Sequence, residues 1–136
     1  MVIKPDLVNG AQRYRHLAVL VARLMDDKKA ENICILDVRK LTVVTDYFVI
    51  SSVTSMPHLR AVWENVEESL RTQENAVPIR REGVPGTPWG VLDYGGIVVH
   101  LMELHVRELY DLERIWTEAK RVVWRSHRTQ KKTVRI

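Results

Sequence analysis

The sequence predicts an α/β domain with a mixed sheet of about five strands flanked by helices. Amphipathic stretches carry apolar residues at helical spacing, short runs rich in β-branched residues lie between them, and a Gly-Gly pair joins two further apolar runs. The resulting order is helix, strand, strand, helix, strand, hairpin, helix. A chain of 136 residues is long enough to bury a core as one domain.

The first half of the chain predicts one helix followed by two strands. Residues 11–29 form the helix, started by Asn9 or Gly10, with charged residues between its apolar positions. Those apolar positions are Tyr14, Leu17, Ala18, Val21, Leu24 and Met25. The runs ENICILDV (31–38) and DYFVISS (46–52) are short and rich in β-forming residues, which predicts the two strands.

A second helix follows, with Ser55 as its N-cap and Pro57 in its first turn. Its apolar stripe consists of Leu59, Val62, Trp63, Val66 and Leu70. The run AVPIRRE (76–82) predicts a short strand, which Pro78 places at an edge of the sheet.

Residues 89–102, WGVLDYGGIVVHLM, predict a tight hairpin around a type I′ turn at Gly95-Gly96. Alternation then divides the side chains between two faces. One face carries Trp89, Val91, Asp93, Val98, His100 and Met102, and the other carries Gly90, Leu92, Tyr94, Ile97, Val99 and Leu101. The second face is nearly pure hydrocarbon and belongs to a core. The first face contains an ionisable pair, which must be satisfied internally or presented to a partner.

Residues 104–123 predict a third helix, with a stripe of Leu109, Leu112, Trp116, Ala119 and Val123.

The segment 120–136 holds seven of the 21 Lys and Arg residues and no acid, so we expect a domain at 1–119 and a basic tail that extends the helix and then loses order. Residues 1–119 retain 14 basic and 17 acidic groups, a formal charge of −3. An acidic body favours a basic partner.

Metal-dependent transfer chemistry needs paired carboxylates, which on a strand lie two residues apart. Asp37, Asp46 and Asp93 are each solitary on their predicted strands. The acidic pair Asp111 and Glu113 falls on a predicted helix, where such positions diverge. We therefore expect no catalytic residue, no metal and no cofactor, and keep a small metal-dependent nucleotidyltransferase or hydrolase as the alternative.

A nucleophilic site is the other enzymatic option, with His100 beside Asp93 and a nucleophile from Ser51, Ser52 or Cys34. Neither serine lies on a G-x-S-x-G elbow, so a satisfied polar pair is the favoured interpretation. The scattered histidines and the single cysteine also argue against a structural zinc site.

The remaining expectations concern the membrane, the compartment and RNA. No stretch reaches the roughly 20 apolar residues of a membrane span. The start of the sequence has neither a signal core nor a transit pattern, so we expect a cytoplasmic protein. The basic tail has two interpretations: an RNA contact with Trp124 available for stacking, or a solvated helix end.

Three blocks of this sequence closely resemble the ribosomal silencing factor family, also called RsfS or Iojap-like. They are ICILDVRKLTVVTDYFVISSVTSMPHLRAVWENVEESL, WGVLDYGGIVVHLM and VRELYDLERIWTEA, and the resemblance covers residues 12–119. It implies a nucleotidyltransferase-like fold without the catalytic carboxylates. It also implies a non-enzymatic protein that docks on ribosomal protein fourteen of the large subunit, blocks joining of the small subunit and so represses translation. Organelle relatives act in large-subunit maturation, and members often crystallise as dimers, so self-association is a further expectation.

The resemblance also implies which residues form the partner-binding site. Its hairpin motif falls on Trp89, Leu92, Asp93 and Tyr94, which it implies bind the partner, while His100, Tyr110, Glu113 and Trp116 support them. The chain departs from the family pattern at Gly96, where an Asp is usual, and at Pro57, where an Arg usually precedes the histidine. The basic tail lies outside the resemblance, and contact between the tail and ribosomal RNA is our own hypothesis.

Overall fold

The structure is a computed structural model that describes residues 5–83 and 86–125. Its elements are α1 (Pro5–Asp27), β1 (Glu31–Asp37), β2 (Tyr47–Val53), α2 (Met56–Glu74), β3 (Arg80–Glu82), β4 (Trp89–Asp93), β5 (Ile97–Glu103), α3 (Leu104–Tyr110), α4 (Leu112–Ile115) and β6 (Lys120–Arg121). The strands form one sheet in the order β3-β4-β5-β2-β1-β6. Only β2 and β5 pair in parallel. The predicted mixed α/β class is confirmed, with six strands in place of about five.

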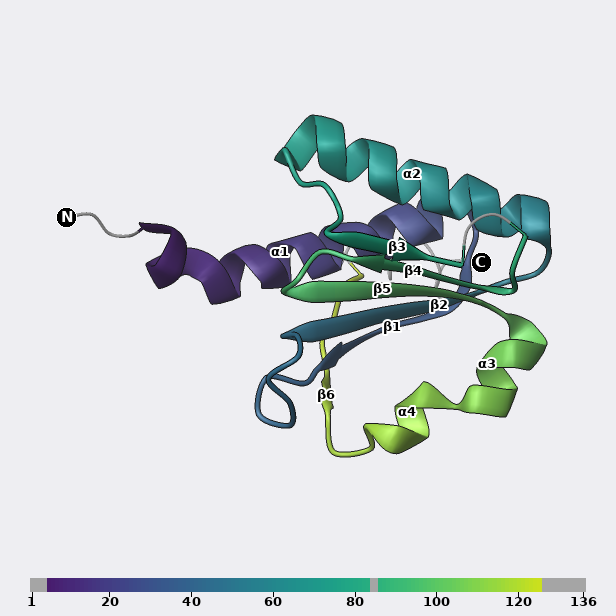
Figure 1. Cartoon of the computed structure of the whole chain (residues 1–136). Coiled ribbons are helices and arrows are strands. Elements are labelled where there is room, and N and C mark those ends of the chain that lie inside the picture. Colours follow the sequence, from purple (N-terminus) through teal and green to yellow (C-terminus); the bar gives the residue numbers. More distant parts are fainter. Residues whose placement is uncertain (1–4, 84–85, 126–136) are drawn as a thin grey trace, which may run out of the picture.

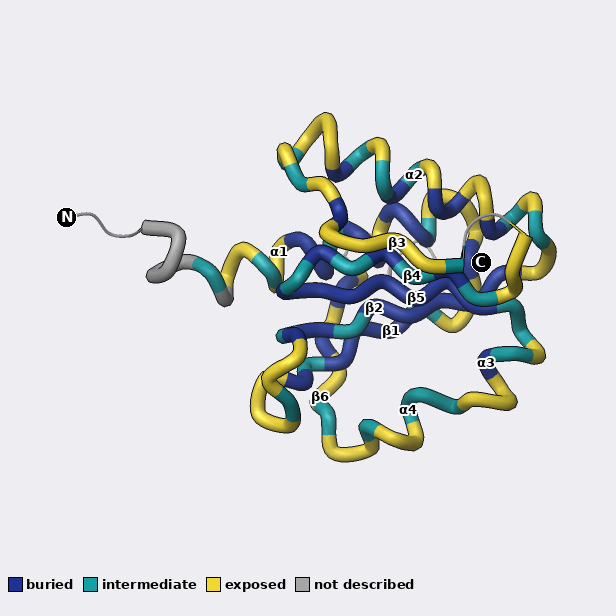
Figure 2. The backbone as a smooth tube through the Cα atoms, viewed as in Figure 1, coloured by how far each residue is buried: buried dark blue, intermediate teal, exposed yellow. Residues whose placement is uncertain are grey.

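The two faces of the sheet are covered differently. The helices α1 and α2 pack against each other and over one face, while α3 and α4 lie on the other side of the sheet, where α3 contacts β5 and β2 (Figure 1). Burial follows this layering, because the central strands β2 and β5 are buried at all but one position each, whereas the short helices α3 and α4 are mostly exposed (Figure 2). The second face is therefore covered by much shorter helices than the first.

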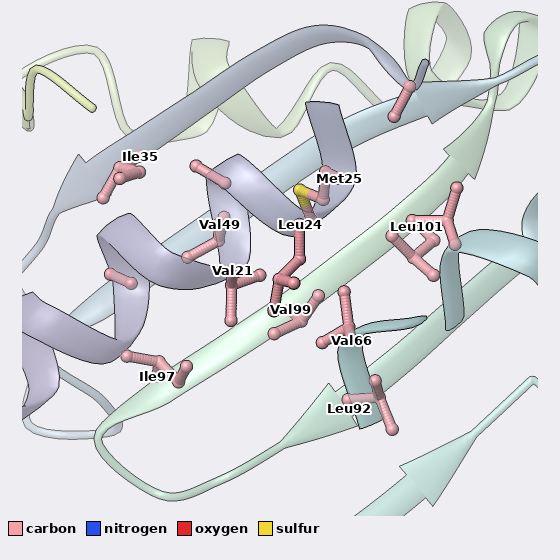
Figure 3. Close-up of a cluster of buried hydrophobic side chains, with 14 of the residues drawn as sticks. Val21, Leu24, Met25, Ile35, Val49, Val66, Leu92, Ile97, Val99 and Leu101 are labelled. Carbon is pink, nitrogen blue, oxygen red and sulfur yellow. The ribbon is translucent and has the colours of Figure 1, made fainter. Parts of the chain in front are cut away.

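The main core lies between the sheet and the helices α1 and α2 (Figure 3). From the sheet it takes Ile35, Val49, Leu92, Ile97, Val99 and Leu101, and from the helices Val21, Leu24, Met25 and Val66. All of these side chains except Leu24, at 7%, are fully buried. The hydrocarbon face predicted for the hairpin is thus confirmed as a core face.

The hairpin has the predicted register, with Trp89 opposite Met102, Val91 opposite His100 and Asp93 opposite Val98. Its turn differs from the type I′ expectation. Only Gly95 has positive φ, at 90°, and positive φ at the first central residue alone is typical of type II′. Gly96 is needed for packing instead, since a Cβ there would clash with the ring of Tyr14 on α1.

The start of α2 is confirmed as predicted. Ser55 has extended backbone angles, and its side chain accepts a hydrogen bond from the backbone N–H of His58 at 3.1 Å. Pro57 lies in the first turn, where its missing N–H costs nothing. The predicted apolar stripe of this helix is buried at all five positions.

The single helix predicted over 104–123 is wrong. Asp111 adopts left-handed angles (φ 46°, ψ 59°) and its N–H donates to the carbonyl of Arg107, which ends α3 after two turns. After the one-turn helix α4, Lys120 and Arg121 pair with β1 as an antiparallel edge strand. The predicted stripe positions Leu109 and Val123 are consequently exposed.

The boundary between a domain at 1–119 and a tail at 120–136 is also corrected. Residues 120–125 belong to the fold, because β6 extends the sheet and Val122 and Trp124 are buried in the main core. A buried Trp124 is not available for stacking on RNA. The rest of the predicted tail, residues 126–136, lies outside the described residues.

Candidate partner-binding site

A groove of about 540 Å³ lies on the sheet face opposite α1 and α2, over β2, β4 and β5. We call it the open-face groove. Its floor and walls are mostly apolar, and its most informative side chains are Phe48, Trp89, Val91, Asp93, His100 and Trp116. The alternating pattern of the hairpin directs the β4 and β5 residues to this face, as predicted.

Aromatic rings from the sheet and from the short helices meet at this groove. Trp89 packs on Tyr110 of α3 with ring centroids 4.8 Å apart, and on His100 at 5.9 Å. Phe48 of β2 packs on His100 and on Trp116, both at 5.4 Å. Four of the predicted site residues are therefore brought together, with a fifth aromatic residue, Phe48, that the prediction missed.

His100 is held as a neutral imidazole. The indole Nε1–H of Trp89 donates to His100 Nδ1 at 3.0 Å, and because indole nitrogen is only a donor, the ring proton of His100 must lie on Nε2. Burial lowers the pKa of His100 to about 4. The His100–Asp93 pair that the sequence suggested does not form, which removes the arrangement of a catalytic base and its orienting carboxylate.

Asp93 instead accepts a backbone hydrogen bond and pairs with an arginine of β3. Its Oδ1 accepts a hydrogen bond from the Gly95 N–H at 2.8 Å, and its Oδ2 lies 3.4 Å from an Nη of Arg80. Arg80 also pairs with Glu82 at 3.2 Å. One arginine between two carboxylates leaves this rim of the groove with a formal charge of −1.

Leu92 and Tyr94 are corrected as candidates for direct partner contact. Their side chains lie on the other face of the hairpin, where Leu92 is fully buried and Tyr94 is 6% exposed beneath the helices. Alternation along β4 puts them there, since Asp93 between them faces the groove. Their contribution to a site is to anchor β4 in the core.

An ion pair that the sequence did not predict holds α3 and α4 beside the groove. Arg107 is only 8% exposed and its Nη2 lies 2.6 Å from Oε2 of Glu113, while its Nη1 donates to Ser52 Oγ at 3.0 Å. Burial raises the pKa of Glu113, but the hydrogen bond and the charge of Arg107 outweigh it and the net shift is downward. The pair joins α3 to α4 and, through Ser52, to β2.

The titration of His100 predicts a specific acid sensitivity. The folded-state pKa of about 4 lies below the ordinary value of 6.5, so the unfolded chain binds more protons between these values and stability falls as pH drops through that window. The His100 contribution amounts to about 3 kcal/mol at most. Denaturant unfolding between pH 4 and 7 should show this loss for the parent chain and a flatter curve for His100→Gln, whose amide oxygen can still accept from Trp89. Equal curves would contradict a buried neutral imidazole.

Two structural findings concern metal binding and membrane-spanning helices. Within residues 5–83 and 86–125, no group of three or more His, Cys, Asp or Glu side chains is placed to hold a metal ion. No helix in the described part of the chain is both long and apolar enough to cross a membrane.

The chain is similar to known proteins in family, in sequence and in structure. The family model described as ribosomal silencing factor during starvation matches residues 11–135, well past the end of the three motif blocks. A ribosomal silencing factor of Bacillus subtilis is 32% identical over 101 residues, covering 74% of this chain and 84% of that protein. The mouse protein named mitochondrial assembly of ribosomal large subunit protein 1 is 34% identical over 101 residues, covering 72% of this chain and 44% of its own length.

Solved structures share this fold. A crystal structure of a Chromobacterium violaceum protein has a TM-score of 0.70 at 28% identity and covers 78% of this chain and 85% of its own. A second, from Bacillus halodurans, has a TM-score of 0.66 at 28% identity and covers 82% of this chain and 98% of its own.

Proposed function

Because the chain belongs to the ribosomal silencing factor family, we propose that it docks on ribosomal protein fourteen of the large ribosomal subunit and blocks joining of the small subunit. The block is steric, so the role requires neither catalysis nor a cofactor. Repression of translation follows from the loss of joined ribosomes. This role places the protein with the ribosomes of the cytoplasm, and a part in large-subunit assembly is consistent with the name of the mouse relative.

The open-face groove is the observation that carries the proposal. Its apolar centre holds Trp89, Phe48 and Trp116, and its rim holds the charged residues Arg80, Glu82 and Asp93. An apolar, aromatic centre inside a polar rim is the usual anatomy of a protein–protein interface, in which buried aromatic residues contribute much of the binding energy. These three aromatic side chains are each only partly buried, so a partner can reach them.

Charge favours a basic partner at this groove. The rim contributes Asp93 and Glu82 against Arg80, a local formal charge of −1. Ribosomal proteins are generally basic because they bind RNA, so the fields are complementary. The docked chain then excludes the small subunit by occupying its position. Ordinary affinity suffices, since an interface of roughly 800 Å² per partner already supports stable complexes.

Co-sedimentation with isolated ribosomal subunits tests the proposal. The parent chain should pellet with the large subunit and not with the small one. Asp93→Asn keeps an oxygen for the Gly95 N–H but removes the charge, and we expect about tenfold weaker binding. Asp93→Arg also introduces repulsion and should weaken binding by about a hundredfold or more.

The matched control is Glu64→Arg, the same kind of charge reversal on the exposed side of α2, beyond the other face of the sheet. It should bind as the parent does. Equal losses for Asp93→Arg and Glu64→Arg would show a general charge effect and exclude the groove as the docking face. A parent chain that pellets with neither subunit would refute the proposed function itself.

A further inference from the structure

A second concave surface lies at the β1–β6 edge of the sheet and is lined by basic side chains. It encloses about 490 Å³, and its cations come from α1, the β1–β2 loop and β6: Arg15, Arg39, Lys40, Lys120 and Arg121. We call it the basic hollow. Its acidic residues are Asp37 and Glu118, so five positive charges face two negative ones.

One of the two acids in the basic hollow, Asp37, is already neutralised by an ion pair. Arg39 binds both carboxylate oxygens of Asp37, with Nε 2.9 Å from Oδ1 and Nη2 2.7 Å from Oδ2. This hydrogen bonding outweighs burial and lowers the pKa of Asp37, which stays ionised. The Arg39 guanidinium also lies 5.4 Å from the centre of the Tyr47 ring, a cation–π contact that restricts its position.

Arg15, Lys40 and Lys120 are the freest of the other cations, because Arg121 also lines the pocket beside Glu113 and lowers the pKa of that carboxyl. Among residues 5–83 and 86–125, the salt bridges do not include Arg15, Lys40, Lys120 or Arg121. Lys120 and Arg121 are held by the pairing of β6 with Asp37 and Leu36, and Arg15 is carried by a long helix. Their backbones are therefore fixed before any ligand arrives. An uncompensated, partly preorganised excess of positive charge predicts an anionic ligand.

We propose that the basic hollow binds the sugar-phosphate backbone of RNA. This inference rests on the proposed function, because the large subunit is mostly RNA. The described residues that line the hollow include no aromatic side chain on which a base could stack, so binding should be independent of sequence and governed by phosphate contacts. An RNA backbone suits cations spread over three elements better than a single small anion does. Residues 126–136 add four further Lys or Arg residues and no acid to the same chain.

The basic hollow and the open-face groove lie at opposite halves of the sheet. The groove spans β4, β5 and β2, and the hollow lies at the outer edge formed by β1 and β6 (Figure 1). With adjacent strands about 4.8 Å apart, the four strand steps from β4 to β6 span roughly 19 Å, and the nearest strands of the two sites, β2 and β1, are neighbours. A ribosomal subunit is large enough to contact both, through protein at the groove and RNA at the hollow.

Fluorescence anisotropy with a short labelled single-stranded RNA tests this site on the full chain. The titration is repeated from about 50 to 200 mM NaCl for the parent and for Arg15→Gln/Lys120→Gln. If two phosphate contacts are lost, the slope of log K against log salt should become shallower by about 1.4. Affinity at the lowest salt should fall by at least about tenfold. Circular dichroism confirms that the double variant keeps its fold.

Two further variants and one competitor make the result specific. Arg60→Gln/Lys28→Gln removes the same number of exposed charges from α2 and the end of α1, away from the hollow, and should bind RNA nearly as the parent does. Lys131→Gln/Lys132→Gln measures how much residues 126–136 contribute to RNA affinity. Polyglutamate of equal charge concentration should compete poorly.

The inference is overturned if Arg15→Gln/Lys120→Gln binds RNA as the parent does, or if Arg60→Gln/Lys28→Gln weakens it equally. Equal competition by polyglutamate would assign the hollow to an acidic protein instead. Failure of the proposed function is distinguishable, because Asp93→Asn should weaken large-subunit binding and keep RNA binding.

Discussion

Replacing Arg107 with methionine should lower the free energy of unfolding by about 3 to 5 kcal/mol. Arg107 is 8% exposed, and its removal leaves the Glu113 carboxylate, whose side chain is 23% exposed, without its counter-charge. The Ser52 hydroxyl loses its donor at the same time. Breaking one member of a buried ion pair costs far more than the pair itself contributes, because the remaining charge stays desolvated.

Urea unfolding at neutral pH measures this loss. Arg114→Met, on the exposed side of α4, is the matched control and should change stability by less than about 0.5 kcal/mol. The double variant Arg107→Met/Glu113→Met should recover much of the loss, since a well-packed apolar pair often replaces a buried ion pair without penalty. A loss no larger than that of Arg114→Met would mean that the pair does not join α3 and α4 to the sheet.

Truncating Leu101 to alanine should cost about 2 to 5 kcal/mol, whereas the same change at Leu109 should cost less than about 0.5 kcal/mol. Leu101 is fully buried in β5 beneath the helices, and its truncation leaves a cavity in the main core. Leu109 is 77% exposed on α3. A continuous helix over 104–123 would instead turn Leu109 toward the sheet.

Thermal or urea unfolding of the two variants therefore also tests the break at Asp111. Comparable losses for Leu101→Ala and Leu109→Ala would favour the continuous helix and contradict the left-handed residue that ends α3. Both variants remove the same atoms, and the cost of the cavity at Leu101 exceeds the difference in strand and helix propensity of about 1 kcal/mol.

The sequence predicted best where a local rule sufficed. The period of two around Gly95-Gly96 set the hairpin register and its core face, and the Ser55 cap with Pro57 set the start of α2. The break at Asp111 could not be read from a stripe at helical spacing, because the pattern remains helical through a single left-handed residue. A two-residue strand such as β6 is too short to show a pattern.

The candidate site was predicted in part. Alternation placed Trp89, Asp93 and His100 on one face, but it could not choose the partner of His100, because Trp89 and Asp93 flank Val91 and are both diagonal to the histidine. The structure pairs His100 with the indole donor, while Asp93 accepts from the Gly95 N–H. Phe48 reaches the groove through the parallel pairing of β2 with β5, a long-range contact that spacing along the chain does not reveal.

Subunit joining is the most direct measurement of the proposed role. Large subunits are incubated with the chain, small subunits are added, and the formation of joined ribosomes is followed by light scattering. We expect the parent chain to reduce joining in proportion to its occupancy of the large subunit, and Asp93→Arg to leave joining unchanged. Normal joining with large subunits that carry the bound chain would contradict steric exclusion as the mechanism.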